Sequence, residues 1–368
     1  MLSRKIMAPL LTLLLAVGVG AAIYLSATEQ LHQRALVEVR GVSGSEKLPF
    51  FQDPETIKLL EAAPHRLVTR VEKAGSREIA TRYDLAPYDF AFPAGSPAAE
   101  KIRRERGVTT AFQVFFTPMV IASWKPVAEV LTANGIVQVR DGIHYVVDMR
   151  KLLELIRQQK RWTDLEEHRA YPANKNILVT TTDIRQSNSA AMFLALASYV
   201  YNGDRIVQDA DQMDQVVGPL GELFLRQGYI EHSSALPFQD YLVMGAGKTP
   251  LVMIYEAQFL HEKAKPDSAV TSDMVLLYPQ PTLFTKHVLI PLTESGKALG
   301  EALTTDEALQ HVAARHGLRT SNIALFNAFV REQGLAVPAS LVDVIEPPSY
   351  EVLEGLIQRI ESRYNALQ

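Results

Sequence analysis

The sequence predicts an α/β fold with a mainly parallel sheet, divided between two domains and preceded by an N-terminal hydrophobic helix. Strand, loop and helix patterns alternate along most of the chain, which is typical of α/β proteins. The chain has 368 residues, and at roughly 150 residues per domain this length suggests two domains. Residues 7–26 contain no charged residue. The composition, 47% hydrophobic and 21% charged, excludes a disordered chain.

The N-terminal segment indicates export. Arg4 and Lys5 precede the uncharged run at residues 7–26, which is about as long as the roughly 20 residues that a membrane-spanning helix needs. A secretory signal has a shorter apolar core and a small-x-small cleavage site, and Leu25-Ser26-Ala27 is a poor version of that site. Residues 1–27 are therefore either an uncleaved inner-membrane anchor or a cleaved signal peptide. Both alternatives place the rest of the chain on the periplasmic side, because the basic residues stay in the cytoplasm.

Three strand–loop–helix units open the exported part. We expect strands at residues 35–42, 67–72 and 88–92, each followed by a loop rich in Gly and Ser and then by a helix. The first helix begins at Asp53-Pro54-Glu55, where Asp suits the N-cap and Pro the first helical position. Successive units of this kind predict neighbouring parallel strands.

The second half continues the alternation with a longer connection. Residues 111–122 are an apolar run that we expect Pro118 to break, and Asp141-Gly142 marks the turn of a hairpin over residues 136–147. Asp148 begins a helix that runs through Gln159. We further expect strands at 177–181, 251–255 and 274–278, a helix at 190–201, and a mostly helical end whose last helix follows Ser349.

The order of four segments resembles bacterial extracellular solute-binding proteins with the type II periplasmic-binding fold, such as sulfate, molybdate and iron binders. These segments are Val39 to Lys47, Tyr88 to Pro97, Lys151 to Leu165 (a helix and then Trp162-Thr163-Asp164-Leu165) and Asn188-Ser189-Ala190, with a return into the first lobe near Tyr278-Pro279, His287 and Leu292. The resemblance implies two α/β lobes joined by crossing strands. It places lobe 1 at residues 35–120, lobe 2 at 121–274, and a return into lobe 1 with a helical tail at 275–368.

The resemblance also implies a ligand cleft between the lobes, where strand ends and helix N-termini face a solute. Hydroxyl and amide side chains, glycines and two arginines in the corresponding loops are the candidate ligand residues. The densest polar cluster lies within residues 181–189, and residues 187–189 are the strongest candidates for ligand contact. Each also has a structural reading as a turn or helix cap, and Arg77 is the candidate clamp for an oxyanion. The candidates are Ser43, Gly44, Ser45, Ser76, Arg77, Gly95, Ser96, Thr181, Thr182, Arg185, Ser187, Asn188 and Ser189.

The leading functional hypothesis is non-catalytic binding of a small, possibly anionic solute, with a membrane transporter or envelope complex as partner. A membrane-anchored scaffold on the same fold, without solute binding, is the alternative. We expect no catalytic residues, metal or cofactor, because the candidate loops are poor in acidic and His side chains and no G-x-S-x-G motif occurs. A net charge of −4 argues against a nucleic-acid partner, and the absence of Cys excludes a lipid-modified N-terminal Cys.

Overall fold

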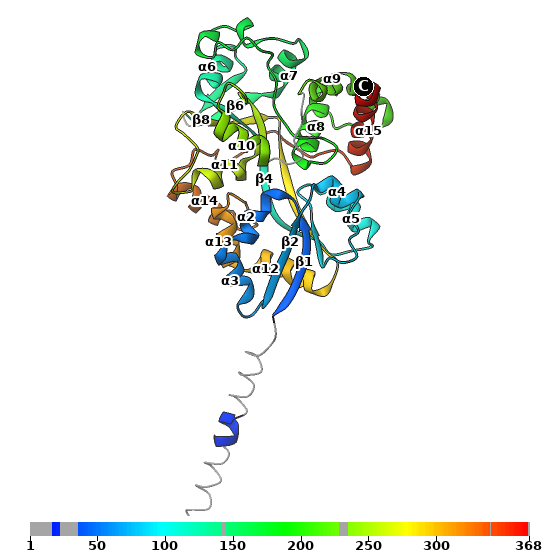
Figure 1. Ribbon diagram of the computed structural model, residues 1–368, viewed down its shortest axis with the longest axis vertical. Coiled ribbons are helices and arrows are strands. Elements are labelled where there is room, and N and C mark those ends of the chain that lie inside the picture. Colours follow the sequence, from blue (N-terminus) through cyan, green and yellow to red (C-terminus); the bar gives the residue numbers. More distant parts are fainter. Residues whose placement is uncertain (1–16, 23–35, 142–143, 228–234, 339, 367–368) are drawn as a thin grey trace, which may run out of the picture.

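The computed structural model describes residues 17–22, 36–141, 144–227, 235–338 and 340–366. Residues 36 onward form two lobes stacked along the long axis of the molecule (Figure 1). Most of the predicted span at residues 7–26 lies outside the described residues, and residues 17–22 are helical. Within the described ranges, no helix is long and apolar enough to span a bilayer.

Lobe 1 is built on the three predicted strand–loop–helix units. Strands β1 (Val37–Ser43), β2 (Leu67–Lys73) and β3 (Phe90–Phe92) are parallel in the order β2-β1-β3. Asp53 is the N-cap of α3 and its carboxylate accepts a hydrogen bond from the Glu55 N–H at 2.8 Å, as predicted. The helices of this lobe are α2 (Leu48–Gln52), α3 (Pro54–Glu61), α4 (Ser76–Thr81), α5 (Ser96–Glu105), α12 (Glu294–Thr305) and α13 (Glu307–Arg315), and the 3-10 turn η1 (Ser45–Lys47) precedes them.

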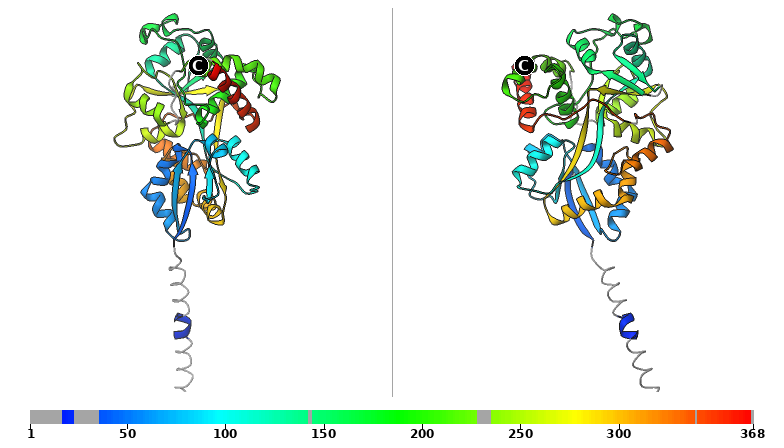
Figure 2. Two further views of the ribbon diagram at one scale, coloured as in Figure 1. Left: turned by 45° about the vertical axis from the view of Figure 1, so that its right-hand side comes forward. Right: turned by 180° about the vertical axis from the view of Figure 1, so that it is seen from behind.

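Two long strands, β4 (Phe112–Trp124) and β9 (Thr282–Pro291), run between the lobes (Figure 2). The first half of β4 is antiparallel to β9, and the second half pairs with β7 (Val252–Tyr255) and β8 (Met274–Gln280). The expected break at Pro118 is wrong. Pro118 is the last β4 residue paired with β9 and Met119 the first paired with β7, so the missing N–H falls where the strand changes partners.

Lobe 2 completes the mixed sheet with β6 (His144–Asp148) and β5 (Val137–Arg140), which form the predicted hairpin. The expected strand at residues 177–181 is wrong, because only Thr180 forms an isolated bridge, to Val252. Asp148 caps α7 as predicted. The helices here are α6 (Lys125–Ala133), α7 (Met149–Arg157), α8 (Asn188–Tyr201), α9 (Ala210–Leu225), α10 (Ala235–Met244), α11 (Glu256–Lys263) and α14 (Ile323–Glu332), with 3-10 turns η2 (Trp162–Asp164) and η3 (His168–Ala170).

The segment after residue 274 contributes α12 and α13 to lobe 1, while its two ends pack on lobe 2. Strand β8 pairs with β4 and β6 of lobe 2, and β10 (Val344–Ile345) pairs in parallel with the start of β9. Helix α15 (Tyr350–Ala366) lies beside α9 in the upper lobe (Figure 1). Its apolar side chains, Val352, Leu353, Leu356, Ile357 and Ile360, belong to the hydrophobic core of lobe 2. The amphipathic pattern predicted this helix, but its packing partner is a lobe distant in sequence.

Candidate functional site

A cavity of about 300 Å³ lies between the two lobes. We call it the interlobe cavity. Lobe 1 contributes the loops that follow β1 and β2, and lobe 2 contributes the loop before α8, the start of α10 and the end of β7. The lining residues are Gly44, Ser45, Glu46, Lys73, Ala74, Gly75, Ser76, Glu78, Gln186, Ser187, Asn188, Leu236 and Tyr255.

The fold explains why polar groups meet here. The carboxyl ends of parallel strands lie at one edge of a sheet, and the chain turns there into helices. Helix α8 begins at this edge, and its N-cap Ser187 makes no side-chain capping bond. The first N–H groups of a helix have no acceptor within the helix, so the start of α8 presents donors to the cavity.

Five of the thirteen predicted ligand residues line the interlobe cavity: Gly44, Ser45, Ser76, Ser187 and Asn188. Three more lie buried close behind them. The Ser189 hydroxyl is 2.9 Å from the Thr182 hydroxyl and 3.0 Å from that of Ser187, and the Ser43 hydroxyl donates to the Phe92 carbonyl at 3.3 Å. These hydroxyls hold the lining loops in place.

Asn188 connects the lobes directly. Its Nδ2 donates to the Ala94 carbonyl of lobe 1 at 3.2 Å and to the Tyr255 hydroxyl at 3.1 Å. Gly95 does not line the cavity, but a Cβ there would lie 2.2 Å from Asn188 Oδ1. Its role is therefore to allow this close approach. Burial, together with the nearby Glu46 carboxylate, raises the pKa of Tyr255 well above its usual value, so the phenol stays protonated.

A buried charged cluster lies at the lobe 1 wall. Glu46 lines the cavity and forms an ion pair with Lys47, with side-chain exposures of 4% and 0%. Lys47 Nζ is also 3.3 Å from His287 Nδ1 and 4.8 Å from the centre of the Phe92 ring. Burial lowers the pKa of Lys47, and the Glu46 carboxylate opposes that effect. Burial and the Lys47 charge hold the pKa of His287 well below its usual value, so His287 is neutral.

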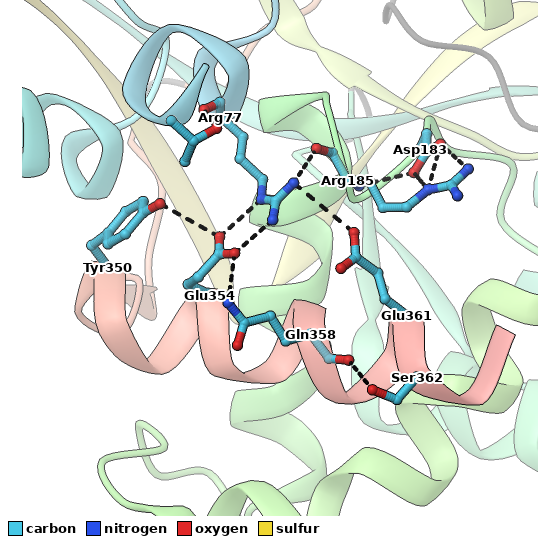
Figure 3. A network of polar contacts seen from close by, with 9 residues as sticks. Arg77, Asp183, Arg185, Tyr350, Glu354, Gln358, Glu361 and Ser362 are labelled. Atoms are coloured by element: carbon cyan, nitrogen blue, oxygen red, sulfur yellow. Dashed lines mark hydrogen bonds and ion pairs between the residues drawn. The ribbon is translucent and has the colours of Figure 1, made fainter. Parts of the chain in front are cut away.

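The two predicted arginines bind carboxylates of the protein instead of lining the interlobe cavity (Figure 3). Arg77 makes a two-point ion pair with Glu354 of α15, at 2.8 Å from Nε and 2.5 Å from Nη2. Its Nη1 donates to the Arg185 carbonyl at 2.7 Å. The Arg185 guanidinium bonds Asp183, whose side chain is 2% exposed. The oxyanion clamp expected of Arg77 is therefore absent from the described cavity.

Two further candidates lie away from the lining. Ser96 is the first residue of α5. Thr181 is buried, and its N–H donates to Gln227 Oε1 at 2.9 Å. Its hydroxyl has no partner among the described residues. Neither residue is among those that line the interlobe cavity.

Besides Gly75, seven lining residues are not among the candidates from the sequence: Glu46, Lys73, Ala74, Glu78, Gln186, Leu236 and Tyr255. Glu78 accepts a hydrogen bond from the Gly75 N–H at 3.2 Å, and its place three residues after Gly75 is a helix-start signal. Tyr255 ends a strand and precedes a helix, the position that supplies ligand groups in this kind of fold. Lys73 likewise ends β2 shortly before α4, whereas Leu236 has no such signal.

No family model and no curated protein matches the sequence. Solved structures do match. The periplasmic thiamin binding protein aligns at a TM-score of 0.56 and 10% identity, over 88% of this chain and 95% of that one. The sulfate-binding protein SubI from Mycobacterium tuberculosis H37Rv gives 0.53 and 14%, over 89% and 99%.

The apo ferric ion-binding protein A from Pasteurella haemolytica gives a TM-score of 0.52 and 10% identity, over 88% of this chain and 97% of that one. In each case the likeness extends over nearly all of the other chain. The chain therefore has the two-lobed fold of the bacterial periplasmic solute-binding proteins, the group that its sequence resembles.

Proposed function

We propose that this chain is an extracytoplasmic, non-catalytic solute-binding protein that closes its two lobes around one small polar molecule. The observation that carries the proposal is the interlobe cavity, which has walls from both lobes and the start of α8 at its edge. The three solved structures described above are binding proteins, which supports a binding role. The thiamin binding protein among them is periplasmic, which supports the same location for this chain, with residues 7–26 as its membrane tether or signal.

The charges at the cavity favour a neutral, zwitterionic or singly charged solute over a doubly charged anion. Both predicted arginines bind protein carboxylates. The cavity is lined by two carboxylates, Glu46 and Glu78, and by one exposed lysine, Lys73. Hydroxyl, amide and backbone N–H groups would then make most contacts with the solute.

Titration calorimetry of the full chain against sugars, amino acids, monocarboxylates and divalent oxyanions tests the proposal. We expect one-to-one binding of a member of the first three classes. Replacing both Ser45 and Ser187 by Ala should weaken it about tenfold or more, because each hydroxyl bond is worth about 1 kcal/mol. Ser321→Ala, at an exposed serine outside the lining, is the matched control. Absence of binding to every class would contradict the proposal.

One observation favours a scaffold as the second candidate. The ion pair of Arg77 with Glu354 and the hydrogen bond from Asn188 to Ala94 join the lobes through protein groups alone. A scaffold would keep its membrane partner when Ser43, Ser45, Ser187 and Asn188 are changed to Ala. Copurification with these variants separates the two functions, since a transport partner that recognises the solute-loaded form would be lost.

A further inference from the structure

A second cavity, of about 450 Å³, lies on the side of the crossing strands that faces away from the interlobe cavity. We call it the rear cavity. Alternate residues of a strand point to opposite faces. On β9, His287 contacts Lys47 and the ring of Tyr255 on the interlobe side, so Phe284 and Lys286 point to the rear. The main lining residues are Phe116, Phe284, Arg319, Phe326, Val330 and Arg331.

The floor of the rear cavity holds a guanidinium whose hydrogen-bonding capacity is only partly used. The Arg319 side chain is 7% exposed. Its backbone pairs with Phe116, at 2.9 and 3.1 Å, and its Nη1 donates to Glu256. Within the described ranges its Nε and Nη2 make no hydrogen bond, and neither is among the buried atoms without a partner. These donors are therefore accessible from the cavity.

Aromatic rings hold this guanidinium in a fixed position. The Arg319 Cζ atom lies 4.0 Å from the centre of the Phe326 ring and 5.9 Å from that of Phe284. The Phe116 and Phe284 rings meet edge to face at 5.9 Å. A planar cation between rings keeps its remaining N–H groups in one direction, and the rings supply apolar walls on either side.

The charge of the rear cavity is positive. Arg331 stands exposed at its rim and forms no ion pair with any described residue. No described Asp or Glu lines the cavity. Glu256, which balances Arg319, is fully buried beneath it and accepts a hydrogen bond from the Tyr278 hydroxyl at 2.9 Å. The rear cavity is thus an apolar space with two arginines, one at its floor with free N–H donors and one at its rim. It complements a small molecule that has an apolar body and one carboxylate.

We propose that the rear cavity is a second ligand site, distinct from the interlobe cavity, for an amphipathic monocarboxylate with an aromatic or short aliphatic body. The carboxylate would bind the free donors of Arg319, with Arg331 adding a second attraction. The body would fill the space between Phe116, Phe284 and Phe326. Because two of these rings belong to the crossing strands, the ligand would contact the segment about which the lobes move.

Fluorine NMR of the full chain tests this with three probes of one shape: para-fluorophenylacetate, para-fluorophenethyl alcohol and para-fluorophenethylamine. We expect the carboxylate to bind, and the alcohol and the amine to bind about tenfold more weakly or not at all. Ile323→Trp fills the cavity mouth from an exposed position and should abolish binding. Arg331→Glu should weaken it about tenfold, since it replaces an attraction by a repulsion.

Two matched variants locate the site. Arg331 lies in the last turn of α14, and Arg106 is likewise an exposed arginine at the end of a helix, so Arg106→Glu should leave binding unchanged. Leu236→Glu changes the interlobe cavity and should also have no effect. Equal binding of the three probes, no binding of the carboxylate, or loss of binding with Leu236→Glu in place of Ile323→Trp would each overturn the proposal.

Discussion

The substitution Gly75→Ala should hold the two lobes apart. Gly75 lies in lobe 1, and a Cβ at this position would meet the Gln186 carbonyl oxygen of lobe 2 at 2.2 Å. Its φ of −69° suits any residue, so alanine brings no backbone strain. The severe conflict is with the opposite lobe, because real Cβ atoms essentially never come closer than 3.0 Å, whereas the Glu78 Oε2 atom of lobe 1, at 3.3 Å, has to shift by only a few tenths of an ångström. The loops must therefore separate by about 0.8 Å or more, the difference between the two distances.

The expected cost follows from overpacking. Forcing an extra methyl group into a well-packed contact costs about 1–3 kcal/mol, which lowers the ratio of closed to open molecules about 5- to 150-fold. The affinity for any solute that needs closure should fall by a similar factor. Gly247→Ala is the control, because no atom lies within 4 Å of a Cβ at that glycine.

Pulsed electron spin resonance measures the opening directly. The chain has no Cys, so spin labels attach only to cysteines introduced at the exposed positions Lys58 in lobe 1 and Gln215 in lobe 2. We expect Gly75→Ala to lengthen the distance between the labels and Gly247→Ala to leave it unchanged. An unchanged distance with Gly75→Ala, at unchanged folding stability, would refute the reasoning.

Three further predictions concern stability and are checked by urea unfolding. Glu354→Gln should lower the free energy of unfolding by about 1–3 kcal/mol, because the Glu354 carboxylate in its ion pair with Arg77 is only 15% exposed. Glu351→Gln is the control and should lower it by less than about 1 kcal/mol, because both side chains of that ion pair are 57% exposed. Equal losses would contradict the bridging role of α15. Glu46→Gln leaves Lys47 buried without its carboxylate partner and should lower the free energy of unfolding by about 3 kcal/mol or more. Adding Lys47→Met removes the unpaired charge and should recover most of that loss. A double variant no more stable than the single variant would contradict the pairing. Burial, and to a lesser degree the stacked His316, lowers the pKa of His261 from 6.5 to about 4. A base whose pKa is lowered in the native state binds its proton less readily in the folded chain than in the unfolded chain. The free energy of unfolding should therefore fall as the pH drops from 6.5 towards 4. After allowance for partial exposure this loss is about 1–2 kcal/mol, and a pH dependence left unchanged by His261→Gln would contradict it.

Features set by neighbouring residues were predictable from the sequence. Asp53 and Asp148 were identified as helix caps because a cap depends on a few consecutive residues. The hairpin around Asp141 has a local turn signal. Pro118 shows the limit of local reasoning: its effect depends on which strand lies opposite, and that partner is more than 130 residues away in sequence.

The candidate site was predictable to a similar degree. Ser45, Ser76 and Ser187 lie at helix starts, and the cavity includes all three. Arg77 has the same sequence setting, but its carboxylate partner Glu354 lies 277 residues later, and no local pattern reveals that pairing. Tyr255 reaches the cavity because β7 pairs with β4, a contact that only the assembled sheet provides.

Native mass spectrometry of the full chain, purified without unfolding, tests the central claim most directly. If the lobes close around one small polar solute, the wild-type chain should carry a single small-molecule adduct. Gly247→Ala should keep the adduct, and Gly75→Ala should lose most of it. A wild-type chain without any adduct, or an adduct that Gly75→Ala retains in full, would contradict the claim that the interlobe cavity binds a solute by closure.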